Sequence, residues 1–369
     1  MIYLDNAATS FPKPPQALLA IRNAMERYGA NPGRAGHSLA IRAARDVYQA
    51  REELAFLFRW KEPLDFVFGF NCTDMLNLAI KGSLSEGDHV ATTAWEHNSV
   101  LRPLKKLEAQ GRITLKVAET IEDALTEKTT AAVITHASNV TGTVHPLHRL
   151  LPMLKARGIL TIVDAAQTAG VLDIDLQSLP VDLLAMPGHK GLLGPQGTGA
   201  LFIRPGIMPD TLREGGTGSS SDSMTQPEEL PERYESGTLN APGLAGLREG
   251  IRFARSHAGE IHAHELFLTR RLIEGLLNIP AVEVYGPHTA AARIGTVSFN
   301  LADVHSGAVA DRLNDAGICV RAGLHCAPGA HRALGTVEQG AVRASAGLYN
   351  TTGDVDALLY VVSKMAKQL

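Results

Sequence analysis

A single lysine, Lys190, stands among glycines in a stretch that neither a helix nor a strand core favours. Residues 186–199 read MPGHKGLLGPQGTG, with apolar runs before and after them. Glycine lets a backbone approach a ligand or another backbone closely. A lysine held there is either a solvated loop charge or a buried amine, and a buried amine loses its proton readily and attacks carbonyl carbons. Composition alone favours the solvated lysine, so other residues must decide.

A carboxylate at the end of a buried strand is the second group with potential chemistry. Asp164 ends an apolar run, and Lys190 follows the next strand along the chain. Alone, Asp164 reads more simply as a structural partner of a helix or loop. A buried carboxylate nevertheless needs a cation or a hydrogen-bonding partner. An imine-forming lysine and a carboxylate that keeps a pyridine nitrogen protonated are the two groups that pyridoxal phosphate requires. The two residues together therefore point to this cofactor.

Other polar side chains follow strands in the same half of the chain. Thr73 lies at a helix N-terminus, where its hydroxyl and the free backbone N–H groups suit a phosphate. The imidazole of His97 could stack flat on a pyridine ring. The complete set of such strand-end groups is Thr73, His97, Asn139, Asp164, Gln167, His189 and Lys190.

Short apolar runs alternate with helical segments over the first two hundred residues. This pattern predicts an α/β fold with a mostly parallel sheet covered by helices on both faces. Polar residues at the strand ends then gather at one edge of the sheet, where α/β proteins place their ligands. The expected strands are residues 65–69, 88–93, 113–117, 130–136, 160–164, 181–186 and 200–203, and the expected helices are residues 17–28, 39–58, 71–80, 99–110, 121–125 and 146–157.

The chain changes character after residue 205. Residues 206–240 are rich in glycine, serine and proline and predict loops. Helices at 242–256, 261–277, 309–316 and 354–369, with strands at 296–301 and 318–322, predict a second, smaller α+β domain. We therefore expect an N-terminal arm (1–15) that packs with the small domain, a large cofactor-binding domain (16–241) and a small C-terminal domain (242–369).

Composition excludes several classes of function. The 369 residues carry a net charge of −3, which argues against a general nucleic-acid binder. No uncharged apolar stretch is long enough for a membrane helix, and the start does not resemble a signal peptide. The three cysteines Cys72, Cys319 and Cys326 form no CxxC pair, which indicates a reducing, cytoplasmic setting with no disulfide framework and no metal site.

Eight motifs spread over nearly the whole chain resemble one family. The sequence is similar to fold-type-I pyridoxal-phosphate enzymes of the class V aminotransferase superfamily, and within it to cysteine desulfurases and selenocysteine lyases. Each motif alone is weak, but their joint occurrence in family order is specific. The motifs are residues 3–8 (YLDNAA), 96–99 (EHNS), 138–142 (SNVTG), 163–167 (VDAAQ), 188–190 (GHK), 237–240 (GTLN), 321–327 (RAGLHCA) and 343–345 (RAS).

The resemblance implies a role for each matching residue. Asn139 and Arg343 are expected to hold the substrate carboxylate, which a planar guanidinium matches with two hydrogen bonds. The cofactor roles fall on Lys190 (imine), Asp164 (pyridine nitrogen), Gln167 (phenolic oxygen), His97 (ring stacking and catalysis) and Thr73, His189 and Thr238 (phosphate), with Thr238 reaching it from the partner subunit of a homodimer.

Cys326 distinguishes the expected reaction from transamination. In the family, a cysteine at this position attacks the sulfur of L-cysteine, releases alanine and carries the sulfur as a persulfide to an acceptor protein, which serves iron–sulfur cluster assembly. The thiolate is the reactive form, and Arg321 and His325 are near enough in sequence to favour it. L-selenocysteine is an alternative substrate. An aminotransferase or epimerase in which Cys326 is incidental is the alternative reaction.

Some residues depart from the family or have simpler explanations. Pro187 replaces a serine that many relatives use toward the phosphate, and residues 329–332 match no familiar acceptor-docking sequence. Arg34 is either a surface charge or a dimer-interface residue near the site. Cys72 and Cys319 are expected to pack in the core. The remaining histidines expected to be solvated or capping are His37, His257, His262, His264 and His331.

Overall fold

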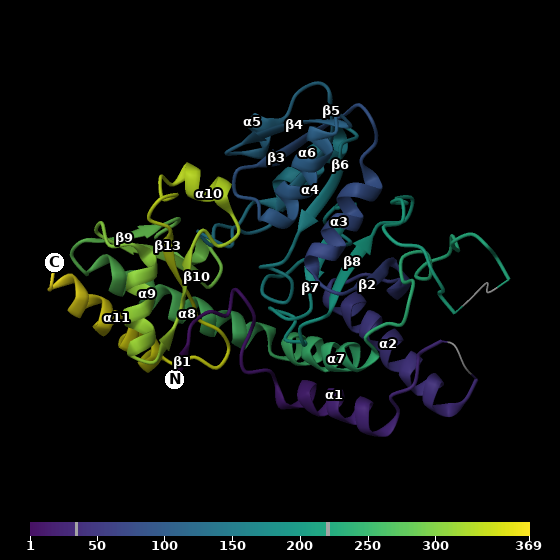
Figure 1. Cartoon of the computed structure of the whole chain (residues 1–369), viewed down its shortest axis with the longest axis horizontal. Helices are drawn as coiled ribbons and strands as arrows, with labels where there is room; N and C mark the ends of the chain where they lie inside the picture. The colour runs from purple at the N-terminus through teal and green to yellow at the C-terminus, as the bar shows by residue number, and fades with distance from the viewer. Residues whose placement is uncertain (34–35, 219–221) are drawn as a thin grey trace.

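A seven-stranded sheet is the largest feature of the computed structural model, which describes residues 1–33, 36–218 and 222–369 (Figure 1). Only β8 runs against the other six strands, so the predicted mostly parallel sheet is confirmed. In sheet order its strands are β2 (Phe66–Gly69), β8 (Gly199–Ile203), β7 (Leu183–Pro187), β6 (Leu160–Asp164), β5 (Thr129–Thr135), β3 (Asp88–Thr93) and β4 (Ile113–Ala118).

Both faces of this sheet are covered, because its strands are apolar on both sides. In β2, Phe66 and Phe68 join the core on one face and Val67 joins the core on the other. Such continuous apolar strands are typical of parallel sheets between helical layers. The first face packs on α2 (Ser38–Leu57), α6 (Leu147–Ala156) and α7 (Ala241–Ser256), and the second face packs on α3 (Cys72–Ser83) and α4 (Asn98–Ala109). Helix α1 (Pro15–Arg27) lies against α7, and α5 (Ile121–Ala124) lies against β3 and β4.

The strand expected at 181–186 begins two residues late. Asp182 is buried just before it and accepts hydrogen bonds from the backbone N–H and the hydroxyl of Thr161, both at 2.9 Å. At its other end, Pro187 is the last residue of β7 and pairs with Gly199. A strand end tolerates proline, which cannot donate to the ladder.

A second, antiparallel sheet stands beside the first (Figure 1). The strand expected at 318–322 divides in two: β11 (Ile318–Cys319) pairs with the N-terminus, and β12 (Arg321–Gly323) joins this sheet. Two of its strands and α10 (Pro328–Ala333) were not predicted. The sheet order is β12, β13 (Ala341–Ser345), β10 (Thr296–Leu301) and β9 (Val282–Tyr285), with α8 (Ala258–Leu277), α9 (Ser306–Asp315) and α11 (Thr352–Ala366) around it.

The N-terminal residues lie beside this second sheet. The short strand β1 (Ile2–Tyr3) pairs in parallel with β11, and Leu4 is fully buried in the same core. The chain then passes to the larger sheet at α1. Helix α7 places Leu244 and Ile251 in the core of the larger sheet. The domain limits at 15 and 241 therefore remain a prediction. Within the described ranges no helix is long and apolar enough to cross a membrane.

Candidate active site

A cavity of about 200 Å³ opens at the carboxyl ends of β5, β6 and β7, with the arm and the second sheet closing its other sides. Parallel strands gather their end residues in this way. The cavity collects all but one of the site residues predicted from the sequence: Thr73, His97, Asn139, Asp164, Gln167, His189, Lys190, Cys326 and Arg343.

Thr238 is the exception. It is exposed in the segment before α7, where Asn31 donates a weak hydrogen bond of 3.4 Å to its hydroxyl. It lines a separate hollow with Gly197 and Asn240. Its predicted contact with the phosphate of a partner subunit remains a prediction. Arg34 lies outside the described residues.

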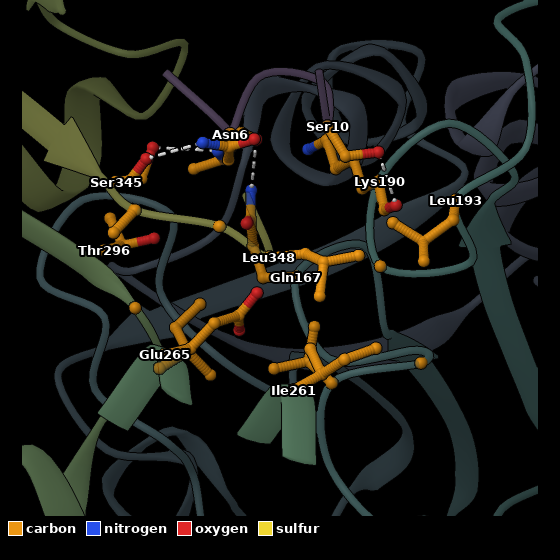
Figure 2. A pocket seen from close by; sticks show the side chains of 18 of the residues that line it. Asn6, Ser10, Gln167, Lys190, Leu193, Ile261, Glu265, Thr296, Ser345 and Leu348 are labelled. Carbon is orange, nitrogen blue, oxygen red and sulfur yellow. Dashed lines mark hydrogen bonds between the residues drawn. The ribbon is translucent and has the colours of Figure 1, made fainter. Parts of the chain in front are cut away.

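The Lys190 loop is held by close contacts that require glycine. A Cβ on Gly188 would come within 2.0 Å of the Thr198 hydroxyl, and one on Gly191 within 2.4 Å of the Ala169 carbonyl. The N-terminal arm covers the loop from above. The Ser10 hydroxyl donates to the carbonyl of Lys190 at 3.1 Å, which Figure 2 shows. Lys13 Nζ, which the sequence did not mark, donates to the carbonyl of His189 at 2.7 Å.

The pKa of the Lys190 amine is lowered, so a far larger share of this amine is neutral near pH 7 than of an ordinary lysine. Burial, followed by the charge of Arg343, lowers its pKa to about 8, although Asp164 acts in the opposite direction. Its Nζ has no hydrogen-bond acceptor among the described residues. Lys190 is half-buried and lines the cavity, so it is not a solvated loop charge, and the neutral fraction of its amine is a nucleophile toward an aldehyde.

Asp164 presents one free carboxylate oxygen to the cavity. Its Oδ1 accepts from the backbone N–H of Ala166 at 2.8 Å and from the Cys72 thiol at 3.7 Å, whereas no described residue bonds Oδ2. Burial raises the pKa of this carboxyl. A cationic N–H on a ligand would satisfy Oδ2 and restore the charged form. Cys72 is buried as expected, but it also touches the site through this contact.

A chain of three side chains joins the expected phosphate site to the expected ring-stacking residue. The Thr73 hydroxyl lies 2.7 Å from the Ser99 hydroxyl, which lies 2.9 Å from Nδ1 of His97. His97 also caps α4 by accepting from the backbone N–H of Ser99 at 3.0 Å. Burial and the nearby charge of Lys190 lower the pKa of His97 to about 4. Ser99 was not assigned a role, although its position in a His-x-Ser helix start is the signal that could have found it.

The phosphate end of the cavity has a buried ring nitrogen without a hydrogen-bond partner among the described residues. This nitrogen is Nδ1 of His189. Burial lowers the pKa of His189 to about 4, which keeps the ring neutral. The first turn of α3 adds backbone N–H groups beside Thr73 that have no acceptor within the helix. A phosphate supplies the oxygens that these groups lack.

Arg343 and Asn139 form the opposite wall. Arg343 donates to the Asn139 carbonyl at 3.1 Å and to Asp5 at 2.8 Å, while its buried Nε has no partner. Burial lowers the pKa of the Arg343 guanidinium. The Asn139 amide donates to the carbonyl of His325 at 2.7 Å, which leaves one of its two amide hydrogens for a ligand. An anionic group fits between these donors.

Cys326 sits on a strained turn at the mouth of the cavity. His325 and Cys326 both have positive φ angles, 50° and 55°, which L-residues rarely adopt. The backbone N–H of Asn98 donates to the Cys326 carbonyl at 2.7 Å and fixes the turn. Cys326 is exposed, so the expectation that it is not a core residue is confirmed. Cys319 is half-buried in β11.

The turn is also held from inside by a histidine pair. His325 Nδ1 lies 3.2 Å from Nε2 of His331, and Nδ1 of His331 lies 2.8 Å from the Thr336 hydroxyl. His331 is fully buried, so its expected place at the surface is wrong. Burial, followed by the charge of Arg343, lowers the pKa of His325 far below its ordinary value. His325 is therefore neutral and cannot favour a thiolate by its charge. Among the residues that line the cavity, Arg321 and Arg343 remain as cations, and the charge of Arg343 reaches Cys326.

A second hollow of about 70 Å³ shares Lys190 and Gln167 with the first (Figure 2). The Gln167 amide donates to the carbonyl of Ala7 at 3.2 Å. Glu265 points its carboxylate into this hollow, and burial raises its pKa to about 7. No sequence pattern predicted a role for Glu265. Among the described residues, no cluster of three His, Cys, Asp or Glu side chains is arranged to hold a metal ion.

Comparison with known proteins identifies one family over nearly the whole chain. Residues 2–358 match the aminotransferase class-V family. The chain is 33% identical over 99% of its length to a probable cysteine desulfurase of Methanothermobacter thermautotrophicus, covering 94% of it. It is 33% identical over its whole length to one of Pyrococcus abyssi, covering 95% of that protein.

Two solved structures extend the comparison. The apo structure of the cysteine desulfurase from Thermococcus onnurineus superposes with a TM-score of 0.93 at 33% identity, over 100% of this chain and 95% of that one. An Escherichia coli cysteine desulfurase gives 0.88 at 26% identity, again over 100% and 95%. The family match and these relatives both extend over nearly the whole chain, and the chain therefore belongs to the aminotransferase class-V family.

Proposed function

We propose that the protein is a pyridoxal-phosphate-dependent cysteine desulfurase that converts L-cysteine to L-alanine and holds the sulfur on Cys326. One observation carries this proposal: the poised amine of Lys190 and the exposed thiol of Cys326 line the same cavity. The names of the relatives support it. A transaminase needs the lysine but has no use for a strained, exposed cysteine that lines the same cavity.

The unsatisfied groups of the cavity fit the cofactor. Lys190 would hold its aldehyde carbon, Asp164 Oδ2 its ring nitrogen, and His97 would stack on the ring. Thr73, Ser99, His189 and the first turn of α3 would hold the phosphate, without the hydroxyl that Pro187 replaces. When bound, pyridoxal phosphate draws electrons away from the α-carbon of an amino acid.

The residues around the cofactor would then act in turn. Arg343 and Asn139 hold the carboxylate of L-cysteine, and Lys190, once released, accepts the α-proton. The thiolate of Cys326 attacks Sγ of the substrate. The new S–S bond forms as the Cβ–Sγ bond breaks, and the electron pair of that bond stays on carbon. Cβ takes up a proton, so L-cysteine and the Cys326 thiol become L-alanine and a Cys326 persulfide.

Further parts of the proposal concern assembly and substrate. We place the protein in a reducing compartment such as the cytoplasm, because its three cysteines are free. A homodimer is supported by the exposed position of Thr238, outside its own cavity. L-selenocysteine fits the same residues, since selenium replaces sulfur at the bond that Cys326 attacks.

The decisive experiment incubates the loaded enzyme with L-cysteine and a reductant, and measures sulfide and alanine together. Equal amounts of both are expected from the wild type, and neither above background from Cys326→Ala. Cys319→Ala, a matched change in β11, should retain activity. If alanine appears equally fast without Cys326, or if amino transfer to a keto acid dominates, the enzyme is instead an aminotransferase or epimerase.

A further inference from the structure

We propose that a groove between α4 and α10 is the docking surface for the sulfur acceptor, and that the acceptor is an acidic protein segment carrying a cysteine beside an apolar side chain. This inference rests on the proposed function, because it concerns the next destination of the sulfur on Cys326. Sequence comparison did not identify such a surface, since residues 329–332 match no familiar docking sequence.

The groove is large and has an apolar floor. Its volume is about 650 Å³, three times that of the catalytic cavity. Leu101 from α4, Val117 and Ala118 from the end of β4, and Ala333 from α10 line it. Val117 is 39% exposed, although it belongs to a strand of the main sheet. An apolar side chain of a partner would remove this surface from water.

The rim of the groove is basic, in a chain whose net charge is −3. Arg102, Lys105 and Arg332 stand against a single carboxylate, that of Glu119. Lys105 is already paired with Glu108 at 2.8 Å. Arg102 and Arg332 are exposed, and no carboxylate among the described residues comes within ion-pair distance of either. Two unpaired guanidinium groups beside an apolar floor favour a partner with carboxylates, which they bind in a planar, two-pronged geometry.

The groove is continuous with the turn that carries the persulfide. Asn98, which lines the groove, donates its backbone N–H to the carbonyl of Cys326 at 2.7 Å. Helix α10 begins two residues after Cys326, and Gly329 packs so tightly that a Cβ there would lie 2.4 Å from the Ala94 carbonyl. The turn and the groove wall therefore form one fixed unit. A segment seated in the groove can bring its own thiol to the exposed Cys326.

The transfer itself needs no further reagent. The acceptor thiolate attacks the outer sulfur of the Cys326 persulfide. A new S–S bond forms, the S–S bond to Cys326 breaks, and its electron pair returns to the Cys326 sulfur as a thiolate. The acceptor leaves with the sulfur as its own persulfide.

Two synthetic peptides test the charge requirement. Both carry one cysteine and one leucine, and they differ only in having glutamates or lysines at the remaining positions. The wild-type enzyme is first loaded with labelled sulfur from L-cysteine, and transfer to each peptide is followed in a single turnover. We expect transfer to the acidic peptide to be at least tenfold faster at low salt, and the difference to shrink as salt screens it.

Charge-reversed variants locate the effect. The double variant Arg102→Glu/Arg332→Glu should prefer the lysine peptide, whereas Arg270→Glu/Lys364→Glu, on exposed faces of α8 and α11, should behave as the wild type. Sulfur release by dithiothreitol, which needs no docking, should stay within twofold in all three. Equal rates for the two peptides, or an unchanged preference in Arg102→Glu/Arg332→Glu, overturns the proposal. The proposal is also overturned if sedimentation shows that the wild type is a dimer and that Arg102→Glu/Arg332→Glu is not. That result would mean that a second copy of the chain covers the groove.

The same experiment separates the two levels of inference. If no labelled sulfur is retained on Cys326 after L-cysteine, the proposed function itself fails. If sulfur is retained and released by dithiothreitol but the peptides are not distinguished, only the docking surface is wrong.

Discussion

The side-chain amide of Asn139 donates a hydrogen bond of 2.7 Å to the carbonyl oxygen of His325. Asn139 follows β5 in the large sheet, and His325 directly precedes Cys326. The expected substrate-binding amide therefore also fixes the turn that presents the thiol. Since both residues are buried, the bond is shielded from competing water.

Asn139→Ala should loosen the Cys326 turn even without substrate. The change leaves the His325 carbonyl without its side-chain donor, at a cost of about 1–3 kcal/mol. Backbone amides of residues 324–328 should exchange hydrogen roughly tenfold faster in the variant, which mass spectrometry of the free protein measures. Asn314→Ala on the surface of α9 is the control. Unchanged exchange in Asn139→Ala would show that the backbone bond from Asn98 alone holds the turn.

Lys190 should react with pyridoxal phosphate at a pH where ordinary lysines do not. With a pKa of about 8 instead of 10.5, roughly 300 times more of the amine is neutral at pH 7. The rate of covalent attachment to the cofactor-free protein should rise between pH 7 and 9 and then level off, as followed by the visible absorption band. A rate that climbs steadily to pH 10.5 contradicts the lowered pKa. Lys190→Ala should give no band.

Glu96 should make the protein less stable as pH rises. It is fully buried, its Oε1 accepts from Thr93 at 2.7 Å and from the Thr135 backbone at 2.9 Å, and its Oε2 has no partner among the described residues. Burial raises its pKa to about 8. Between the unfolded pKa near 4.5 and the folded pKa near 8, the folded state binds more protons, so stability falls with pH in this window and levels off above it.

Glu96→Gln, which mimics the neutral acid, isolates this effect. In the wild type, Glu96 should make the free energy of unfolding fall by up to about 1.4 kcal/mol per pH unit in this window. In Glu96→Gln this contribution to the slope should be absent. Denaturant titrations of both proteins from pH 5 to pH 9 measure the difference. Parallel curves for the two proteins would mean that Glu96 is ionised in the folded state.

His331→Ala should destabilise the protein although the residue touches no expected substrate. It removes a fully buried ring and leaves His325 Nδ1 and the Thr336 hydroxyl unpaired. A loss of about 2–4 kcal/mol in unfolding free energy is expected from the cavity and the lost hydrogen bonds. His305→Ala, at the exposed start of α9, should lose no more than about 2 kcal/mol, the cost of its cap. Equal losses in both variants would contradict a role for the buried pair.

The sequence predicted the large sheet because its strands are apolar on both faces and stand between helices. It also placed Asp164 and Lys190 together, since parallel strands bring their ends to one edge. Strands β9 and β13 were not predicted from the sequence. Strand β9 (Val282–Tyr285) is short, with alternating apolar and polar residues, and β13 (Ala341–Ser345) contains a buried arginine. These features give weak local signals, and it is pairing with neighbouring strands, β10 for both and also β12 for β13, that makes them strands.

Only some of the residues of the site could be predicted from the sequence. Residues in family motifs could be placed, but His331 could not, since only tertiary packing buries it. Glu265 and the groove beside α10 depend on the approach of segments distant in sequence, such as α4 and α10, and no local pattern encodes that approach. The predicted role of Thr238 depends on a second copy of the chain, so it is still a prediction.

The central claim is that Lys190 and Cys326 act on one substrate in one cavity. The most direct test mixes the loaded enzyme with one equivalent of L-cysteine without reductant and measures the mass of Cys326 and the amount of alanine. We predict one added sulfur atom on Cys326 and one alanine per site, and neither in Lys190→Ala. Alanine formed without added sulfur on Cys326, or at full rate in Cys326→Ala, would contradict the claim.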